Sequence, residues 1–462
     1  MYFKQITTPG LGCLSYIIGC PGAKVCAVVD PKRDAQDYLD ITREEGMRIT
    51  HVIETHIHAD HVSGNQELAA ATGAEICYME GSPITYPHTV LKEGDEMVLG
   101  NAKLRFLHTP GHTPHAMSIL VTDTARADEP WLLLTGDLLF VGDVGRPDLA
   151  GEELFQEQAE NLYRSLYDKL GYLPDRIEVF PAHGQGSLCG KGMSFKSNTT
   201  LGFERVANWA FQFTSKQAFL DQVLGEFPIR PMSFTHIITT NMNGAPLLER
   251  CPLEKSLSLE SFKARMDAGA VVIDTRDTAA FGGVHIPASV NIGFDRQTAN
   301  WVGMVVDPKA EIILVVEDKP QYDAMLLELH RIGYDNITGY LAGGISTWVF
   351  AGMPVEKLDQ LPVQQLKDLI HRSDNGAPRI IDVRTPGEWE AGHLAEAQHL
   401  PLMQVLKEGI DAPRDEELIV ICGSGYRSNI VASHLQENGY TEAKSVAGGM
   451  FAWANSGFPV TK

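Results

Sequence analysis

The chain has 462 residues, which suggests about three domains of ~150 residues each. Its 38 Lys and Arg are outnumbered by 59 Asp and Glu, so the formal net charge of −21 excludes the basic surface that nucleic acid or an anionic membrane attracts. With 44% hydrophobic and 21% charged residues, the composition provides for packed cores and excludes general disorder.

Residues 1–225 alternate short apolar runs with polar or Gly/His-rich loops. These runs predict strands, and they lie at 25–29, 51–53, 104–107, 131–134 and 177–180. Segment 226–250 is rich in residues that break regular structure, among them Pro228, Pro231, Gly244 and Pro246. We therefore expect a first domain over 1–225 and a linker over 226–250.

The second half of the chain contains an internal repeat. Asp382 follows Asp274 by 382 − 274 = 108 positions, and the segment 446–453 echoes 341–348 at an offset of 105. The two copies predict domains over 251–356 and 357–462. In the second copy, 380–383 and 418–421 predict buried strands and 428–438 predicts the helix after them. Such alternation is typical of a parallel sheet covered by helices.

Metal-ligating residues cluster after the predicted strand 51–53. His56, His58, Asp60 and His61 fall within six residues, and side chains two positions apart in an extended segment project to one side. Three further candidates each follow a predicted strand at its carboxyl end: His112, Asp137 and His183. Ligands at several strand ends can converge on one edge of a sheet, so the pattern predicts a metal site.

This set resembles the metallo-β-lactamase fold, a four-layer αββα sandwich, over residues 1–225. In hydrolases of the glyoxalase II type, the resemblance implies two metals held by all seven residues. In persulfide dioxygenases it implies one Fe(II), with His56, His112 and Asp137 as ligands. In that case four residues would support the iron site or line a vacant second site: His58, Asp60, His61 and His183.

Two segments near these ligands bear on the choice of substrate. Residues 145–148 resemble the Gly-Arg-x-Asp of persulfide dioxygenases, so Arg146 is a candidate clamp for a substrate carboxylate or else a structural ion pair with Asp148 or Asp143. After His183 the chain lacks the Asp-Tyr of many stand-alone persulfide dioxygenases and lacks the helical extension of glyoxalase II. Cys189 is either a sulfur acceptor or a buried inert thiol, and Lys191 would lower its pKa if both are exposed.

A second chemical motif follows the predicted strand 418–421. Cys422 stands at a strand-to-helix turn, where backbone N–H groups and the helix N-terminus favour a thiolate or a persulfide anion. Arg427 is placed to hold a sulfite or thiosulfonate oxygen. The residues between them form the predicted substrate-binding loop: Gly423, Ser424, Gly425 and Tyr426. A phosphate-binding loop is the chemical alternative.

This loop resembles the active site of rhodanese domains, as do Asp382, His393 and the closing motif Gly448-Gly-Met-x-x-Trp453 of the same repeat. In the first repeat, the 105-residue offset places Glu317 where Cys422 stands and Tyr322 where Arg427 stands. That copy therefore lacks the nucleophile and is predicted to be inactive, with Asp274 and His285 as scaffold residues.

Together the motifs predict an enzyme that oxygenates a small thiol persulfide to sulfite at one Fe(II) and transfers sulfane sulfur through Cys422 to give thiosulfate. Two alternatives stay open: a two-zinc thioester hydrolase with a sulfurtransferase domain, and a persulfide carrier or sensor. Seven scattered cysteines without a CxxC pair, and a first segment without a signal-peptide pattern, predict a cytoplasmic location. We expect no nucleic-acid or membrane partner, and a homo-oligomer is compatible with the inactive repeat.

Overall fold

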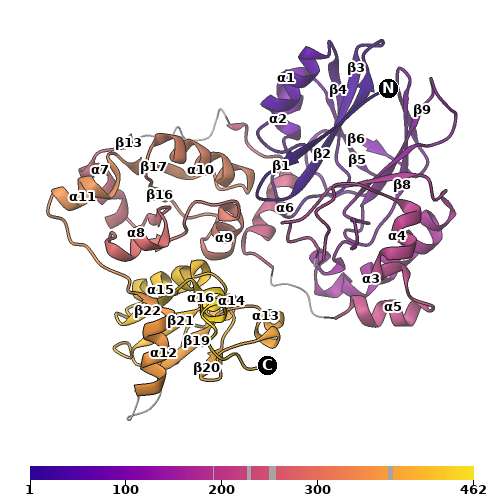
Figure 1. Ribbon diagram of the computed structural model, residues 1–462. Coiled ribbons are helices and arrows are strands. Elements are labelled where there is room, and N and C mark those ends of the chain that lie inside the picture. Colours follow the sequence, from indigo (N-terminus) through magenta and orange to yellow (C-terminus); the bar gives the residue numbers. More distant parts are fainter. Residues whose placement is uncertain (191, 226–229, 249–255, 373–377) are drawn as a thin grey trace. The chain divides into compact units, whose positions relative to one another are not determined.

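The computed structural model describes residues 1–462 except 191, 226–229, 249–255 and 373–377 (Figure 1). The chain forms two compact units, residues 1–251 with 327–334, and residues 252–326 with 335–462. Among the described residues, no helix is long and apolar enough to cross a membrane.

Two six-stranded sheets make up most of the first unit. The first has the strand order β1-β2-β3-β4-β5-β6 and the second the order β12-β11-β10-β9-β8-β7. The strands of the first sheet are β1 (Tyr2–Thr8), β2 (Cys13–Cys20), β3 (Val25–Val29), β4 (Arg48–Ile53), β5 (Glu75–Met79) and β6 (Thr89–Leu91). Those of the second are β7 (Glu96–Leu99), β8 (Ala102–His108), β9 (Met117–Asp123), β10 (Leu132–Gly136), β11 (Glu178–Pro181) and β12 (Thr199–Thr200).

The alternation of side chains along β2 shows why the sheets are layered. Tyr16 and Ile18 point to one face and pack with Phe106 and other residues of the second sheet. Ile17 points to the opposite face and packs beneath Tyr38 of helix α1 (Gln36–Glu44) and Leu68 of helix α2 (Asn65–Thr72). Both faces of the strand are therefore buried in apolar cores.

Helices cover the outer face of the second sheet as well. Leu133 of β10 and Val179 of β11 pack against Leu162 of helix α3 (Phe155–Arg164) and Phe219 of helix α5 (Lys216–Val223). Helix α4 (Leu201–Ala207) follows β12. The order helix, sheet, sheet, helix confirms the αββα sandwich that the sequence predicts.

The segment predicted as a linker is largely a helix. Helix α6 (Ser233–Asn243) occupies the middle of 226–250, and its residues Phe234 and Ile237 are buried in the first unit. Phe234 packs with Ala59 and Leu149. The prediction was wrong here because Pro231 and Gly244 flank the helix instead of interrupting it, and a proline just before a helix is well tolerated.

The second unit contains two five-stranded sheets, and among the described residues their strands pair in parallel. Their orders are β13-β17-β16-β14-β15 and β18-β22-β21-β19-β20, which are the same order in the two repeats. The strands of the first repeat are β13 (Ser256–Leu257), β14 (Val271–Asp274), β15 (Val290–Asn291), β16 (Ile312–Val315) and β17 (Ile337–Leu341). Those of the second are β18 (Gln360–Pro362), β19 (Arg379–Asp382), β20 (Ala397–His399), β21 (Leu418–Ile421) and β22 (Ala443–Ala447).

Helices separate these strands, as parallel connections require. In the first repeat they are α7 (Leu259–Asp267), α8 (Thr278–Gly283), α9 (Thr298–Val305), α10 (Lys319–Arg331) and α11 (Gly344–Phe350). In the second they are α12 (Val363–Arg372), α13 (Pro386–Ala391), α14 (Leu402–Glu408), α15 (Tyr426–Glu437) and α16 (Gly449–Asn455). The predicted helix 428–438 is α15, which begins two residues earlier because Gly425, at φ 98°, caps it in the left-handed region.

The same internal supports recur in both repeats. Asp274 accepts hydrogen bonds from Arg276, and Asp382 accepts them from Arg384 in the same way. His285 stacks on Phe281 with ring centroids 3.9 Å apart. Because Asp274 and His285 are buried and held by neighbours within their own repeat, they have the contacts that a scaffold role requires.

Polar side chains join the two repeats inside the second unit. Asn429 of α15 donates from Nδ2 to Asn291 Oδ1 at 2.5 Å, and its own Oδ1 accepts from Gln360 Nε2 at 2.6 Å. Asn291 N donates to Ser433 Oγ at 3.1 Å. Asn429 is fully buried, so each of these hydrogen bonds replaces solvation that the side chain has lost.

Replacing Asn429 with Ala should therefore lower the free energy of unfolding of the second unit by about 1–3 kcal/mol, because Asn291 and Gln360 lose a buried partner. Urea unfolding followed by circular dichroism measures this change. Asn455→Ala, at an exposed position of α16, is the matched control and should have little effect. Equal stability of the two variants would contradict the proposed coupling between repeats.

Candidate metal centre and sulfur-transfer loop

All seven predicted metal ligands lie at the carboxyl ends of strands in the first unit and are buried. The loop after β4 carries His56, His58, Asp60 and His61, and the other three follow β8, β10 and β11. Six of the seven fall into groups linked through Asp137 and His183, and possible ligand atoms within each group lie within 4.8 Å of one another. His58 belongs instead to a separate group with Asp30 and Glu54.

His56, His112 and Asp137 form the first of these groups. Asp137 Oδ2 lies 3.8 Å from His56 Nε2 and 3.5 Å from His112 Nε2. Among the described residues, His56 Nε2 and Asp137 Oδ2 are buried with no hydrogen-bond partner. Buried polar atoms are normally satisfied, so these atoms fit a shared metal ion.

The far sides of the two imidazole rings are held by hydrogen bonds. His112 Nδ1 donates to the carbonyl oxygen of Arg146 at 2.8 Å, and His56 Nδ1 lies 3.0 Å from Thr55 Oγ1. These contacts orient each Nε2 toward Asp137, as is usual for metal-bound histidines. Burial lowers the pKa of His112, and burial together with the charge of His58 holds the pKa of His56 well below its usual value. These shifts favour the neutral form of both rings, which is the form that binds a metal ion.

His58 is clamped by two carboxylates that the sequence reasoning did not identify. Its Nε2 lies 3.1 Å from Glu54 Oε2 and 3.2 Å from Asp30 Oδ1. Burial lowers the pKa of His58, but Asp30 and Glu54 outweigh burial and raise it to about 9. Its Nδ1 is buried without a hydrogen-bond partner among the described residues.

Asp30 ties the metal loop to the end of β3. It adopts a positive φ of 50°, which Asp tolerates better than most residues, and its carboxylate accepts hydrogen bonds from Thr55 N and Oγ1. Asp30 directly follows a predicted strand and precedes a proline, and this position could have identified it in the sequence as a candidate site residue.

Asn241 of α6 supports the same loop from the opposite direction. Its Nδ2 donates to the carbonyl oxygens of His58 and His61, each at 2.9 Å, and its Oδ1 accepts from Ser63 N. These contacts join residues about 180 positions apart through backbone atoms. Contacts of this kind produce no recognisable spacing of residues, so the role of Asn241 could not be predicted from the sequence.

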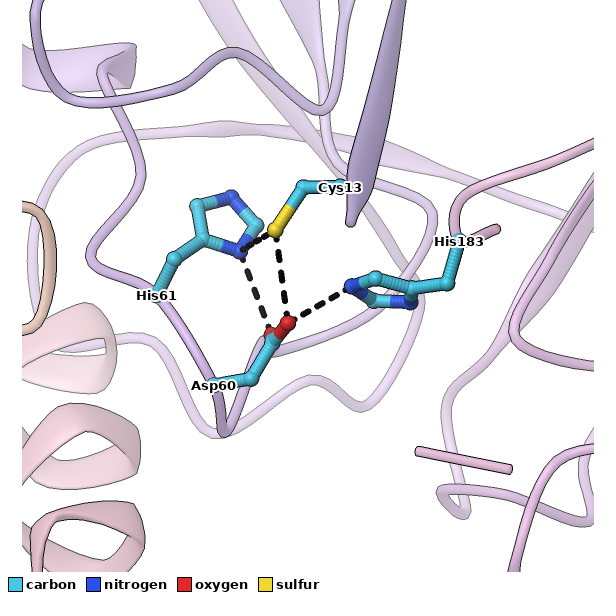
Figure 2. A group of neighbouring side chains, drawn as sticks. All are labelled: Cys13, Asp60, His61 and His183. Atoms are coloured by element: carbon cyan, nitrogen blue, oxygen red, sulfur yellow. Dashed lines mark hydrogen bonds and ion pairs between the residues drawn. The ribbon is translucent and has the colours of Figure 1, made fainter. Parts of the chain in front are cut away.

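Asp60, His61 and His183 form a separate group together with Cys13, the first residue of β2 (Figure 2). His183 Nε2 lies 2.7 Å from Asp60 Oδ2, while its Nδ1 donates to Asp137 Oδ1 at 2.6 Å. Burial opposes ionisation of both groups. The charge of His183 nevertheless holds the pKa of Asp60 well below its usual value, and Asp137 together with Asp60 holds the pKa of His183 well above its usual value. The sequence analysis did not single out Cys13.

Arg146 is engaged with Asp148. Its Nε and Nη2 donate to the two carboxylate oxygens at 2.7 and 2.6 Å, a forked pair, and the guanidinium is buried. Of the two roles considered for Arg146, the ion pair is the one that the structure shows. It also lines a cavity of about 280 Å³ with Trp209 and Val223.

Cys189 lies next to the metal ligands but is buried. It is 1% exposed, and its sulfur belongs to a group with Asp137 and His183. Burial and the nearby carboxylates raise the pKa of its thiol well above the usual value, which is opposite to the lowering expected for an exposed Cys189. Lys191 lies outside the described residues.

Cys422 follows β21 directly, as predicted, and its sulfur is buried under its own loop. The Gly425 N–H donates to Sγ at 3.2 Å, and Sγ lies 3.5 Å from Ser428 Oγ. Together with the N-terminus of the 12-residue helix α15, this N–H favours a negative charge on sulfur. Gly449, in the motif that closes this repeat, packs against the loop so closely that a Cβ on it would lie 2.3 Å from the carbonyl oxygen of Cys422. A glycine is therefore required at this position.

Arg427 is paired with Glu388 of α13. Its Nη1 and Nη2 donate to the two carboxylate oxygens at 2.7 and 2.6 Å. Burial raises the pKa of Glu388, but the guanidinium outweighs burial and lowers it to about 2. A depressed carboxyl pKa contributes stability above the unfolded-state value of ~4.5, and this contribution is lost as the pH falls toward 2. The sequence analysis assigned Arg427 to substrate and did not foresee this partner.

The loops of the two repeats border one cavity inside the second unit. Glu317 of the first repeat lines a space of about 470 Å³ with Ser424 and Tyr426 of the second. The Tyr426 hydroxyl donates to the Gly293 carbonyl at 2.7 Å, and Gly423 packs near Arg427. Tyr322 is buried against Tyr340.

The predicted alignment of the two loops was wrong by one residue. Val315 pairs with Asp274 as Ile421 pairs with Asp382, so Val316 stands at the position of Cys422, and the same 106-residue offset places Gln321 at that of Arg427. The first repeat therefore has an apolar side chain where the second has its thiol.

Comparison with known proteins identifies the domains. Residues 8–183 match the metallo-beta-lactamase superfamily, and residues 258–351 and 363–456 each match the rhodanese-like domain. A solved structure of a metallo-beta-lactamase from Staphylococcus aureus subsp. aureus COL is 34% identical, with a TM-score of 0.67 over 73% of this chain and 98% of that one. The chain therefore belongs to the metallo-beta-lactamase superfamily and carries two C-terminal rhodanese domains.

Relatives of the first domain include two enzyme classes. The hydroxyacylglutathione hydrolase of Methylococcus capsulatus is 38% identical over 170 residues, which are 36% of this chain and 60% of that protein. The human mitochondrial persulfide dioxygenase ETHE1 is 28% identical over 188 residues, 39% of this chain and 67% of that protein. The chain thus spans about 60% of the length of the hydrolase that it matches.

Glu388→Gln should strengthen the binding of anionic sulfur donors, because it removes the charge that competes for Arg427. In a thiosulfate sulfurtransferase assay we expect KM for thiosulfate to fall roughly two- to fivefold, matching the ~0.4–1 kcal/mol of a partly exposed ion pair. Glu390→Gln, on the exposed side of the same helix, is the control and should leave KM unchanged. An unchanged or higher KM for Glu388→Gln would show that Arg427 does not meet the donor.

Proposed function

We propose that this protein oxidises the persulfide of a low-molecular-weight thiol to sulfite in its first domain and transfers sulfane sulfur through Cys422 to give thiosulfate. The observation that supports this proposal is the group of His56, His112 and Asp137, whose facing atoms include a buried nitrogen and a buried oxygen without partners. Two imidazoles and one carboxylate are the ligand set of non-haem Fe(II) oxygenases.

The first reaction balances as RSSH + O₂ + H₂O → RSH + H₂SO₃, in which the outer sulfur is oxidised and O₂ is reduced. An Fe(II) ion held by the triad would supply open positions for O₂ and for a substrate sulfur. The protein's own part is to keep both imidazoles neutral and oriented. Thr55 and the Arg146 carbonyl hold the rings, while Asn241 and Asp30 hold the loop.

In the second reaction, the Cys422 thiolate attacks the outer sulfur of RSSH, forming an enzyme persulfide and releasing RSH. Sulfite then takes that sulfur, giving thiosulfate and restoring the thiolate. The Gly425 N–H and the start of α15 stabilise the anion in both states of the sulfur. Because both domains are in one chain, sulfite is produced at a raised effective concentration for Cys422.

Cys422→Ser should separate the two reactions. With a glutathione persulfide and O₂, the variant is expected to form sulfite at the wild-type rate while losing thiosulfate formation, because a serine cannot carry sulfane sulfur. Both products can be measured by chromatography of the derivatised anions. Cys20→Ser, at a partly exposed cysteine of the first unit, serves as the control and should make both products. Continued thiosulfate formation by Cys422→Ser would show that Cys422 does not carry out the second reaction.

A two-zinc thioester hydrolase is the second candidate for the first domain. It is supported by the presence of Asp60, His61 and His183 and by the 38% identity to a hydroxyacylglutathione hydrolase. A persulfide carrier or sensor would have no use for this buried ligand set.

His112→Ala tests the iron assignment. Loss of one of three ligands should remove bound iron and O₂ uptake together, because a carboxylate and one imidazole hold Fe(II) poorly. Metal analysis and an oxygen electrode measure the two quantities. His115→Ala, in the same loop but outside the ligand groups, should retain both. Thioester hydrolysis by a zinc-loaded wild-type protein, without O₂ uptake on persulfide, would favour the hydrolase.

A further inference from the structure

Cys13 takes no part in the proposed reactions, yet it lies among metal-ligating side chains. It begins β2 at the end nearest the metal loop, and its thiol is buried. Figure 2 shows its sulfur directed at Asp60 and His61, with His183 on the other side of the carboxylate. The family resemblance gives Asp60, His61 and His183, together with His58, as residues that support the iron or line a second site, and none of the seven residues in that set is a cysteine.

The two distances from the Cys13 sulfur fit a metal coordination shell. Cys13 Sγ lies 3.4 Å from Asp60 Oδ2 and 3.6 Å from His61 Nδ1. With Zn–S near 2.3 Å and Zn–N or Zn–O near 2.0–2.1 Å, the edge of a tetrahedron between sulfur and a lighter ligand is about 3.5 Å. A cation bound here would thus meet the sulfur with little movement of the chain.

His183 provides an independent sign of a missing ligand. Its Nδ1 is fixed by Asp137 Oδ1, so its Nε2 is directed toward Asp60. That nitrogen forms an ion pair with Asp60 Oδ2 at 2.7 Å, and it is buried without a hydrogen-bond partner among the described residues. The ring is 1% exposed, so water does not satisfy it from bulk solvent.

We propose that Cys13, Asp60, His61 and His183 form a second, thiolate-containing metal site that binds Zn²⁺. Its donors are one sulfur, one carboxylate oxygen and two imidazole nitrogens, a closed four-ligand set of the kind that zinc takes in structural sites. The triad of His56, His112 and Asp137 has no sulfur and only three ligands, which leaves positions open. The difference in donor type gives the two sites different preferences, and the thiolate site favours the softer ion.

Cobalt(II) provides a direct probe of this site, because a thiolate bound to cobalt gives a near-ultraviolet charge-transfer band that imidazole and carboxylate ligands do not give. The full chain is stripped of metal, reduced, and titrated with CoCl₂ under argon in the Cys189→Ser, Cys422→Ser background. This background removes the two other thiols that lie in or beside a proposed site. We expect the band to reach a plateau and ZnSO₄ to abolish it by displacement.

Adding Cys13→Ser to this background should remove the band while cobalt still binds at the sulfur-free triad. Cys26→Ser is the matched control, because it replaces a buried cysteine of the neighbouring strand β3 that belongs to none of the metal-ligating groups, and it should retain the band. A band of full intensity in Cys13→Ser would overturn the proposal.

If Cys13→Ser does not fold, the proposal is tested with Cys13 intact. X-ray absorption at the zinc edge of the zinc-loaded background protein should then show a sulfur neighbour at about 2.3 Å. A shell of nitrogen and oxygen alone would contradict the thiolate site. Neither experiment uses persulfide or O₂, so its outcome is independent of the proposed reactions.

Discussion

The hydrogen bond between His183 Nδ1 and Asp137 Oδ1 joins the two groups of ligands in the first domain. One oxygen of Asp137 is committed to His183, and the other faces His56 and His112. This division requires the ends of β10 and β11 to lie side by side, which their parallel pairing provides. The pairing in turn depends on the two packed sheets, because their common core fixes which strand ends meet at this edge. The geometry of both sites therefore follows from the sandwich.

Functional residues that belong to short local motifs could be predicted from the sequence. His56 and Asp137 could be predicted as candidate ligands because histidines and aspartates directly after apolar runs stand out. The repeat was found because both copies keep the Asp-x-Arg pair and the closing Gly-Gly. In the same way, Cys422 stood out because it lies between a buried strand and glycines.

The residues that were missed act through distant or backbone contacts. Asn241 supports the metal loop by binding two carbonyl oxygens, and its helix lies in a segment whose prolines and glycines predicted a linker. Glu388 neutralises Arg427 across 39 positions, a pairing that no spacing rule supplies. Cys13 is far from the other ligands along the chain and meets them only through the fold of β2.

Ion pairs within the protein change the interpretation of its net charge of −21. An acidic protein that handles sulfur anions needs local positive potential, and Arg146 and Arg427 were the obvious sources. Both are held in forked ion pairs, with Asp148 and Glu388. In the described structure, the groups directed at the Cys422 sulfur are instead the Gly425 N–H and the start of α15. Bound metal would provide the positive charge in the first domain.

The central claim is that the triad holds iron and uses O₂. Metal content and O₂ uptake, measured on one anaerobically purified sample of the full chain supplied with a glutathione persulfide, test it most directly. The account predicts one iron per chain and one O₂ consumed for each sulfite formed in a Cys422→Ser background. A protein that is filled with zinc, contains no iron and consumes no O₂ would contradict it.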